Sequence, residues 1–131
     1  MPTSAGEPAE RRGTRQRVGS RGEDLAAAEL TRRGYSILQR NYRCTAGEID
    51  IVAFDGDVLA FVEVRTRRSD AFGTPEESVT RTKIRHLIDC AETYLQEQPV
   101  EASWRIDVVA IELSLDGAVK RLEVIQNAAG G

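Results

Sequence analysis

Residues 47–65 contain two apolar segments with acidic residues toward one end of each, and this pattern predicts two β-strands. The first strand is expected over residues 48–54 and the second over residues 58–65. The dipeptide Asp55-Gly56 stands between them, and such a dipeptide favours a tight hairpin turn. The centre of the chain is therefore predicted to form an antiparallel β-hairpin.

The acidic residues of this hairpin can meet on one face. Because successive side chains of a strand point to opposite faces, Glu48 and Asp50 share a face of the first strand, as Glu63 and Arg65 do in the second. A two-residue loop of Asp55-Gly56 places Glu48 opposite Glu63, and a four-residue loop ending at Val58 places Asp50 opposite Glu63. An odd loop length separates the two sets. Opposed carboxylates repel, so a cationic group is expected between them.

Two interpretations of these acidic residues follow from the pattern: a solvated face of the hairpin, or a metal site. The face that carries them also carries Val52, Phe54 and Phe61, and the other face is apolar. Since both faces are therefore expected to be partly covered, clustered carboxylates are costly there unless a metal ion or a basic group compensates them. The pattern alone leaves both interpretations open.

The flanking segments predict helices and further strands. Ser20-Arg21-Gly22-Glu23 matches a capping box, so the first helix is expected to begin at Ser20 and to end at Gly34. Apolar residues at helical spacing predict a second helix over about residues 78–96. Further strands are expected over residues 35–42, 104–113 and 118–125. This order of elements predicts an α/β fold, with a mixed central β-sheet flanked by helices.

One domain is expected over residues 20–126, between a flexible basic arm over residues 1–19 and a frayed tail over residues 127–131. The first 22 residues carry five arginines and two glutamates, although the net charge of the chain is −3. A basic arm could touch a phosphate backbone, or it could simply be solvated. The overall charge gives no support for strong nonspecific binding of nucleic acid.

Composition narrows the class of protein. Hydrophobic residues make up 40% of the 131 residues, which is enough for the core of a single domain. Apolar runs stay shorter than the roughly 20 residues of a membrane span, and a signal peptide is not apparent, so no membrane association is expected. Cys44 and Cys90 lie far apart in sequence, which argues against a zinc ribbon or a disulfide framework and fits a cytoplasmic location.

The hairpin residues suit one kind of chemistry if they bind a metal. Asp50 and Glu63, with the carbonyl of Val64, are oxygen ligands of the kind that Mg²⁺ or Mn²⁺ prefers. Such an ion can activate water and stabilise the charge that builds on a phosphate during phosphodiester hydrolysis. Arg65 shares the face of Glu63 and could neutralise charge on the attacked phosphate.

Residues 47–52 (Gly-Glu-Ile-Asp-Ile-Val) and 61–65 (Phe-Val-Glu-Val-Arg) resemble the signature of the YraN family. These are uncharacterised bacterial proteins assigned to the restriction-endonuclease-like nuclease superfamily. The resemblance covers nearly all of the chain after the arm. It extends to Gly22-Glu23 with Ala26-Ala27, Arg40-Asn41-Tyr42-Arg43, Phe72-Gly73, Lys83 and Arg105-Ile106-Asp107-Val108-Val109.

The resemblance implies a PD-(D/E)xK-type core related to archaeal Holliday-junction resolvases. Asp50 and Glu63 would then be metal ligands with a contribution from Glu23, although a capping role explains Glu23 equally well. Arg65 would take the basic position, where the superfamily usually has Lys. Arg keeps the positive charge but cannot lose its proton to act as a base. Lys83 is a candidate substitute if the fold brings it to Asp50 and Glu63.

The implied function is a metal-dependent endonuclease that uses Mg²⁺ or Mn²⁺ to cleave DNA, including branched DNA. Arg67, Arg68 and Lys83 would contact the nucleic acid. A catalytically silent module that binds nucleic acid is the alternative, favoured by Arg65 and the basic arm, and an adaptor that uses the fold for protein contacts is a third hypothesis. Resolvase relatives act as homodimers, although no dimer surface is apparent in the sequence.

Overall fold

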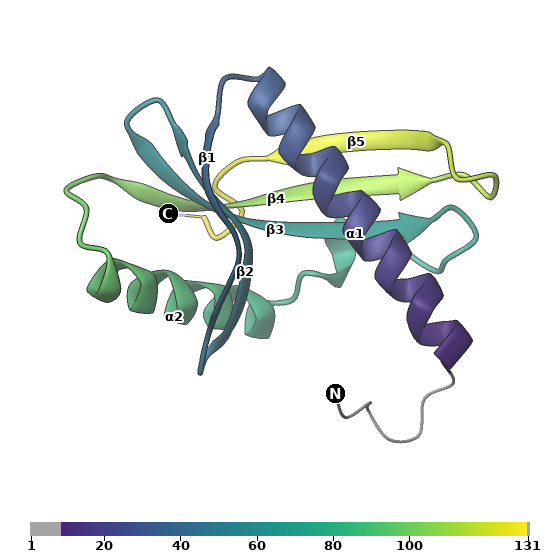
Figure 1. The fold of residues 1–131 in the computed structure, drawn as a ribbon, viewed down its shortest axis with the longest axis horizontal. Helices are drawn as coiled ribbons and strands as arrows, with labels where there is room; N and C mark the ends of the chain where they lie inside the picture. The colour runs from purple at the N-terminus through teal and green to yellow at the C-terminus, as the bar shows by residue number, and fades with distance from the viewer. Residues whose placement is uncertain (1–8, 131) are drawn as a thin grey trace.

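The structure is a computed structural model that describes the backbone of residues 9–130 and the side chains of residues 19–130. Two α-helices, a short 3₁₀ helix and five strands make up the described residues (Figure 1). Within the described part of the chain, no helix is long and apolar enough to cross a membrane. The elements are α1 (Ala9–Arg32), β1 (Ser36–Cys44), β2 (Gly47–Asp55), β3 (Val58–Arg68), a short 3₁₀ helix (Glu76–Ser78), α2 (Arg81–Glu97), β4 (Trp104–Leu113) and β5 (Val119–Ile125).

The five strands form one sheet in the order β1-β2-β3-β4-β5. Strands β3 and β4 run parallel, because α2 carries the chain back between them, and the other neighbouring pairs are antiparallel. The prediction of an α/β fold with a mixed central sheet flanked by helices is confirmed. Figure 1 shows β1 and β2 turning away from the other three strands beyond the point where β2 meets β3.

Each helix covers its own face of the sheet with a separate apolar cluster. Ala26 and Leu30 of α1 pack on one face, against buried residues such as Ile51 and Val62. Leu87 of α2 packs on the other face, against a cluster that includes Phe61. Since β2 and β3 are covered on both faces, their polar residues lie where the cover ends.

The register of the β2–β3 hairpin settles which acidic residues face each other. Asp55 pairs with Val58, so the turn is Gly56-Asp57, one residue later than predicted. Gly56 has φ +61, a left-handed conformation that glycine adopts readily, and this favours Gly56 at the first position of the turn. The resulting register is the one in which Asp50 comes opposite Glu63.

Two predicted boundaries are wrong. The first helix begins at Ala9 and not at Ser20, so residues 9–19 of the predicted arm are helical, while residues 1–8 lie outside the described part. Ser20 and Glu23 therefore lie inside the helix, and the capping-box interpretation fails. Glu, Arg and Gln before Ser20 favour helix, and they outweigh the isolated glycines once a helix is nucleated by packing.

The predicted frayed tail also begins too early. The backbone N–H of Asn127 donates to Asp107 Oδ1 at 3.0 Å, and that of Ala128 donates to the carbonyl of Ile106 at 2.7 Å. Asn127 adopts a left-handed φ of 53°, which Asn tolerates better than most residues. These contacts hold the chain against the start of β4 as far as Ala128.

Candidate metal-binding site

Asp50 lies where β2 and β3 separate. The regular pairing of the two strands ends at Ile51 and Val62, and Asp50 and Glu63 occupy the next position. Asp50 Oδ2 accepts a hydrogen bond from the backbone N–H of Val64 at 2.8 Å, so its carboxylate reaches across to β3. Because the two strands diverge here, the half-buried Asp50 carboxylate lies between them, beyond the last regular pair of the β2–β3 ladder.

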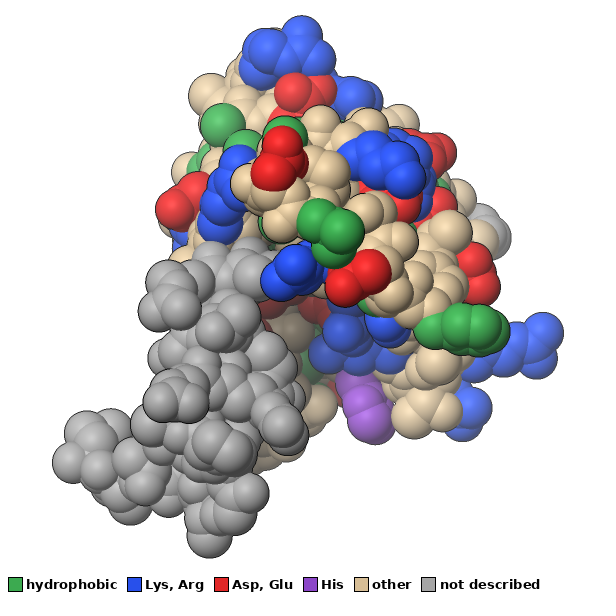
Figure 2. All heavy atoms as spheres, turned by 90° about the vertical axis from the view of Figure 1, so that its right-hand side faces the viewer, with side chains coloured by type: hydrophobic (Ala, Val, Ile, Leu, Met, Phe, Trp, Pro, Cys, Tyr) green, Lys and Arg blue, Asp and Glu red, His purple; other side chains and the backbone are tan. Residues whose placement is uncertain are grey.

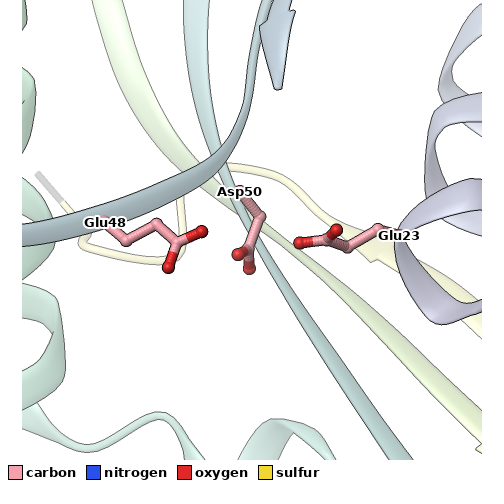
Figure 3. Close-up of side chains that lie close together, drawn as sticks. All are labelled: Glu23, Glu48 and Asp50. Atoms are coloured by element: carbon pink, nitrogen blue, oxygen red, sulfur yellow. The ribbon is translucent and has the colours of Figure 1, made fainter. Parts of the chain in front are cut away.

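Three carboxylates converge at this point. Oxygen atoms of Glu23 from α1 and of Glu48 and Asp50 from β2 all lie within 4.8 Å of one another, and Figure 3 shows the three side chains pointing toward a common space. With its amide nitrogen turned toward them, Asn41 donates to Glu23 at 2.9 Å and to Glu48 at 3.0 Å. Asn41 has φ 56°, and this left-handed residue in β1 brings its side chain to the site.

Glu63 is the fourth carboxylate and has cationic partners of its own. Its side chain is 5% exposed, and its Oε2 lies 3.0 Å from Arg65 Nη2 and 3.4 Å from Lys83 Nζ. Lys83 is in the first turn of α2, where Thr80 caps the helix by accepting from the Lys83 N–H. The fold therefore brings Lys83 to Glu63, one of the two carboxylates that the substitution hypothesis named, while no ion pair joins Lys83 to Asp50 among the described residues.

The electrostatics of Asp50 differ from those of an ordinary surface carboxylate. Burial raises the pKa of Asp50 to about 8, with further increases from neighbouring Glu63 and Glu23, while the Val64 N–H acts in the opposite direction. Among the described residues, no Lys or Arg forms an ion pair with Asp50, whereas Glu63 has two. A cation is the group that would complete this environment.

Arg65 is only partly engaged. Its Nη2 contacts Glu63, but its Nε is buried and has no hydrogen-bond partner among the described residues. An unsatisfied guanidinium nitrogen is costly unless a further acceptor binds it. On the face seen in Figure 2, basic side chains gather at the edge of a hollow in which acidic side chains are also visible. Such an arrangement can hold a cation and an anion side by side.

Two of the predicted nucleic-acid contacts lie farther along β3. Arg67 shares the face of Glu63, and its Nη1 donates to the carbonyl of Phe72 at 3.5 Å. Arg68 is exposed on the other face, with its Nε 3.8 Å from Asp70. Neither residue is part of the carboxylate cluster, and their predicted contact with nucleic acid stays a prediction.

Sequence reasoning assigned the site unevenly. Asp50, Glu63 and Arg65 come together on the predicted face, and Glu23 joins them from α1 as the resemblance implied. Glu48 was expected on the acidic face of the hairpin but was not named as a metal ligand, and its carboxylate belongs to the cluster. Asn41 appeared in the sequence analysis only as part of a motif. Its left-handed backbone conformation, which brings its side chain to the carboxylates, could not be seen in the sequence.

The fold and the site define a mixed α/β protein that has a cluster of carboxylates where β2 and β3 separate. Such a cluster is suited to binding a cation. The profile of the family described as "Uncharacterised protein family UPF0102" matches residues 22–111. The chain belongs to this family, the YraN family that its sequence resembles.

Curated relatives agree over most of the chain. A protein of Moorella thermoacetica is 50% identical over 116 residues, covering 88% of this chain and 97% of the relative. A protein of Caldicellulosiruptor saccharolyticus is 43% identical over 115 residues, covering 87% of this chain and 98% of the relative. A Roseiflexus castenholzii protein is 49% identical over 119 residues, covering 88% and 95%. Each is named only as a UPF0102 protein, so the similarity shows the family. Any inference about activity has to come from the geometry of the site.

Proposed function

We propose that this protein is a metal-dependent endonuclease that hydrolyses phosphodiester bonds of DNA. The observation that carries the proposal is the contrast between Asp50 and Glu63. Asp50 faces other carboxylates without a cationic partner in the described part of the chain, while Glu63 beside it is paired with two basic residues. A divalent cation at Asp50 and a phosphate at the basic residues would complete both halves.

The donor set fits Mg²⁺ or Mn²⁺. Glu23, Glu48 and Asp50 offer carboxylate oxygens within 4.8 Å of one another, and Glu63 comes from the facing strand. Hard divalent cations prefer such oxygen ligands, and no Cys or His belongs to this described cluster. When bound, the ion would supply Lewis acidity and a water activated for attack on a phosphodiester.

The basic residues would divide the remaining work. Arg65 is held beside Glu63 by its Nη2, and its side chain stays partly exposed, so the guanidinium group can donate a hydrogen bond to a phosphate oxygen. Lys83 Nζ lies 3.4 Å from the carboxylate of Glu63, and lysine, unlike arginine, can lose its proton. Lys83 on α2 thus supplies the exchangeable ammonium that the usual Lys of β3 would provide, with Arg65 as the fixed charge.

The test is cleavage of labelled single strand, duplex, flap, four-way junction and RNA, with Mg²⁺ or Mn²⁺. Asp50→Asn should abolish cleavage, because it removes a central ligand while keeping the size of the side chain. Asp57→Asn is the matched control, since Asp57 is an exposed acid in the turn of the same hairpin and should leave cleavage unchanged. Cleavage by Asp50→Asn at the wild-type rate would refute the site.

The silent nucleic-acid-binding module is the second candidate. The observation that favours it is Arg65, which lacks the proton chemistry of Lys at the position expected to be catalytic. It predicts salt-dependent binding of the same panel in EDTA together with no cleavage in any metal. Cleavage by wild type that Asp50→Asn removes would exclude it.

A further inference from the structure

An apolar pocket lies beside the candidate metal site, on the α2 face of the sheet. Its volume is about 200 Å³. A second cavity of about 490 Å³, the outer groove, adjoins this inner pocket. The two share Val79, Ile84 and Ala128. The inner pocket is completed by Glu76, Val108 and Ile125, and the outer groove by Arg81, Arg85 and Ala129.

Two residues of the inner pocket are neighbours of the Glu63 site, one in the sheet and one along α2. Val108 in its wall pairs in register with Glu63 across the parallel strands β3 and β4. Ile84 in the opposite wall directly follows Lys83, whose Nζ is 3.4 Å from Glu63. The inner pocket is therefore the immediate neighbour of the candidate site, one strand away.

The inner pocket matches a flat, mainly apolar ring. Five of its six lining side chains are apolar, and its volume is below the roughly 300–1,000 Å³ of pockets that hold whole drug-sized ligands. Glu76 is the charged exception, but Arg121 contacts both of its oxygens, at 2.7 and 3.1 Å, and neutralises it. A single heterocyclic ring suits this space better than an extended molecule.

The outer groove matches an anion. Arg81 and Arg85 stand one turn apart on α2, and both are exposed. Within the described part of the chain, neither forms an ion pair, so both guanidinium groups are open to a ligand. Guanidinium groups bind phosphate with two parallel N–H donors, and an apolar ring beside a phosphate is the chemistry of a nucleotide.

We propose that the inner pocket receives a nucleobase of the nucleic-acid substrate, while Arg81 and Arg85 bind the backbone phosphates of the same strand. This rests on the proposed function in that the ligand is a nucleic acid. The base must leave its stack to enter the inner pocket, and unpaired bases do so at the lowest cost. Single-stranded or branched DNA is therefore bound in preference to a continuous duplex.

The first test fills the inner pocket. Ala128→Phe places a ring in the space without removing a wall, and Ala102→Phe, at a half-buried alanine outside both cavities, is the matched control. Binding of a fluorescent single-stranded oligonucleotide is followed by anisotropy in EDTA. Ala128→Phe should weaken binding by about 10-fold, a loss typical of one stacked base, and Ala102→Phe should bind as wild type does.

The second test removes the guanidinium groups of the outer groove. Arg81→Ala with Arg85→Ala should lower the slope of log affinity against log salt by about 1.4, because each lost phosphate contact on a single strand contributes about 0.7. Methyl NMR signals of Val79, Ile84 and Ile125 should shift when the oligonucleotide is added to wild type. Unshifted methyl signals at saturation, or wild-type affinity in Ala128→Phe, would overturn the assignment.

The outcomes separate this inference from the proposed nuclease. If wild type binds through the inner pocket but cleaves nothing, the nuclease fails and the base site stands. If cleavage depends on Asp50 while Ala128→Phe binds like wild type, the base site fails and the nuclease stands. If wild type binds no nucleic acid at low salt, both are overturned.

Discussion

Two aspartates in one sheet, Asp107 in β4 and the half-buried Asp50 in β2, have opposite surroundings. Asp107 of β4 is fully buried, and fixed donors surround its carboxylate. Arg105 Nε lies 2.8 Å from Oδ1, the Tyr35 hydroxyl donates to Oδ2 at 3.0 Å, and the Asn127 N–H donates to Oδ1 at 3.0 Å. Asp50 of β2 accepts one backbone N–H and otherwise faces carboxylates.

The difference separates structure from function. Around Asp107, donors from three parts of the chain offset the cost of burial, and the guanidinium hydrogen bond to Asp107 raises the pKa of Arg105 in return. Around Asp50, burial and like charge raise the pKa to about 8. The first carboxylate holds the fold together, and the second destabilises it unless a cation binds, as is typical of a functional site.

Replacing Asp107 should have the largest effect on folding. Asp107→Ala leaves Arg105 Nε, the Tyr35 hydroxyl and the Asn127 N–H without their acceptor, while Arg105 Nη2 keeps its ion pair with Asp55. Because several buried donors lose their partner together, the free energy of unfolding should fall by about 3–5 kcal/mol. Urea denaturation at neutral pH measures the loss. A loss below about 1 kcal/mol would show that this network contributes little to stability.

Replacing Asp50 should raise the free energy of unfolding, whereas replacing Asp107 lowers it. Between the ordinary pKa of 3.8 and about 8, the folded state holds a proton that the unfolded state has released, so wild-type stability falls as pH rises through this window and is constant above it. Asp50→Asn lacks this term. The full shift corresponds to about 5–6 kcal/mol, and solvent screening of this half-buried carboxylate reduces it. Asp50→Asn should therefore be more stable than wild type by about 2–3 kcal/mol at pH 8 and about equal at pH 4.

The measurement is urea denaturation of both proteins at pH 4, 6 and 8 in EDTA. A difference that stays constant across this range would contradict the raised pKa. Asp57→Asn again serves as control, because Asp57 is exposed in the turn and should give no pH-dependent difference.

The sequence predicted the parts of this comparison that follow from local periodicity. A period of two places Asp50 and Glu63 on one face whenever the loop is even, and the strand pattern predicted the sheet. The choice between the two even registers depended on the backbone of Gly56, which shifts the turn by one residue. Turn geometry is a property of φ angles and is only weakly encoded in a dipeptide.

Contacts between distant segments could not be predicted in this way. The Asp107 network joins Tyr35 to Asp107 across 72 residues, and no spacing in the sequence indicates that pairing. Glu23 reached the site through the length and path of α1, which starts at Ala9 because local propensity outweighed the apparent cap at Ser20. Packing, not periodicity, set these positions.

Metal binding should stabilise wild type through Asp50. At a free Mn²⁺ concentration ten times the dissociation constant, the free energy of unfolding should rise by about 1.4 kcal/mol. Asp50→Asn should lose this increase while Asp57→Asn keeps it. Thermal denaturation across a Mn²⁺ titration measures the effect. If Mn²⁺ stabilised Asp50→Asn as much as wild type, the ion would have to bind at a site that does not include Asp50.

The smallest effects are expected at Glu63, which stands between the two extremes because either of two cations can compensate it. Lys83→Met and Arg65→Met should each cost less than about 1 kcal/mol, since the other basic residue remains within 3.4 Å of Glu63 or closer. The double variant should cost about 1 kcal/mol more than the sum, because Glu63 is then buried without a partner. Strict additivity in urea denaturation would contradict this shared role. Arg105→Met provides the contrast, because Asp107 has no second cation among the described residues and the single change should already be costly.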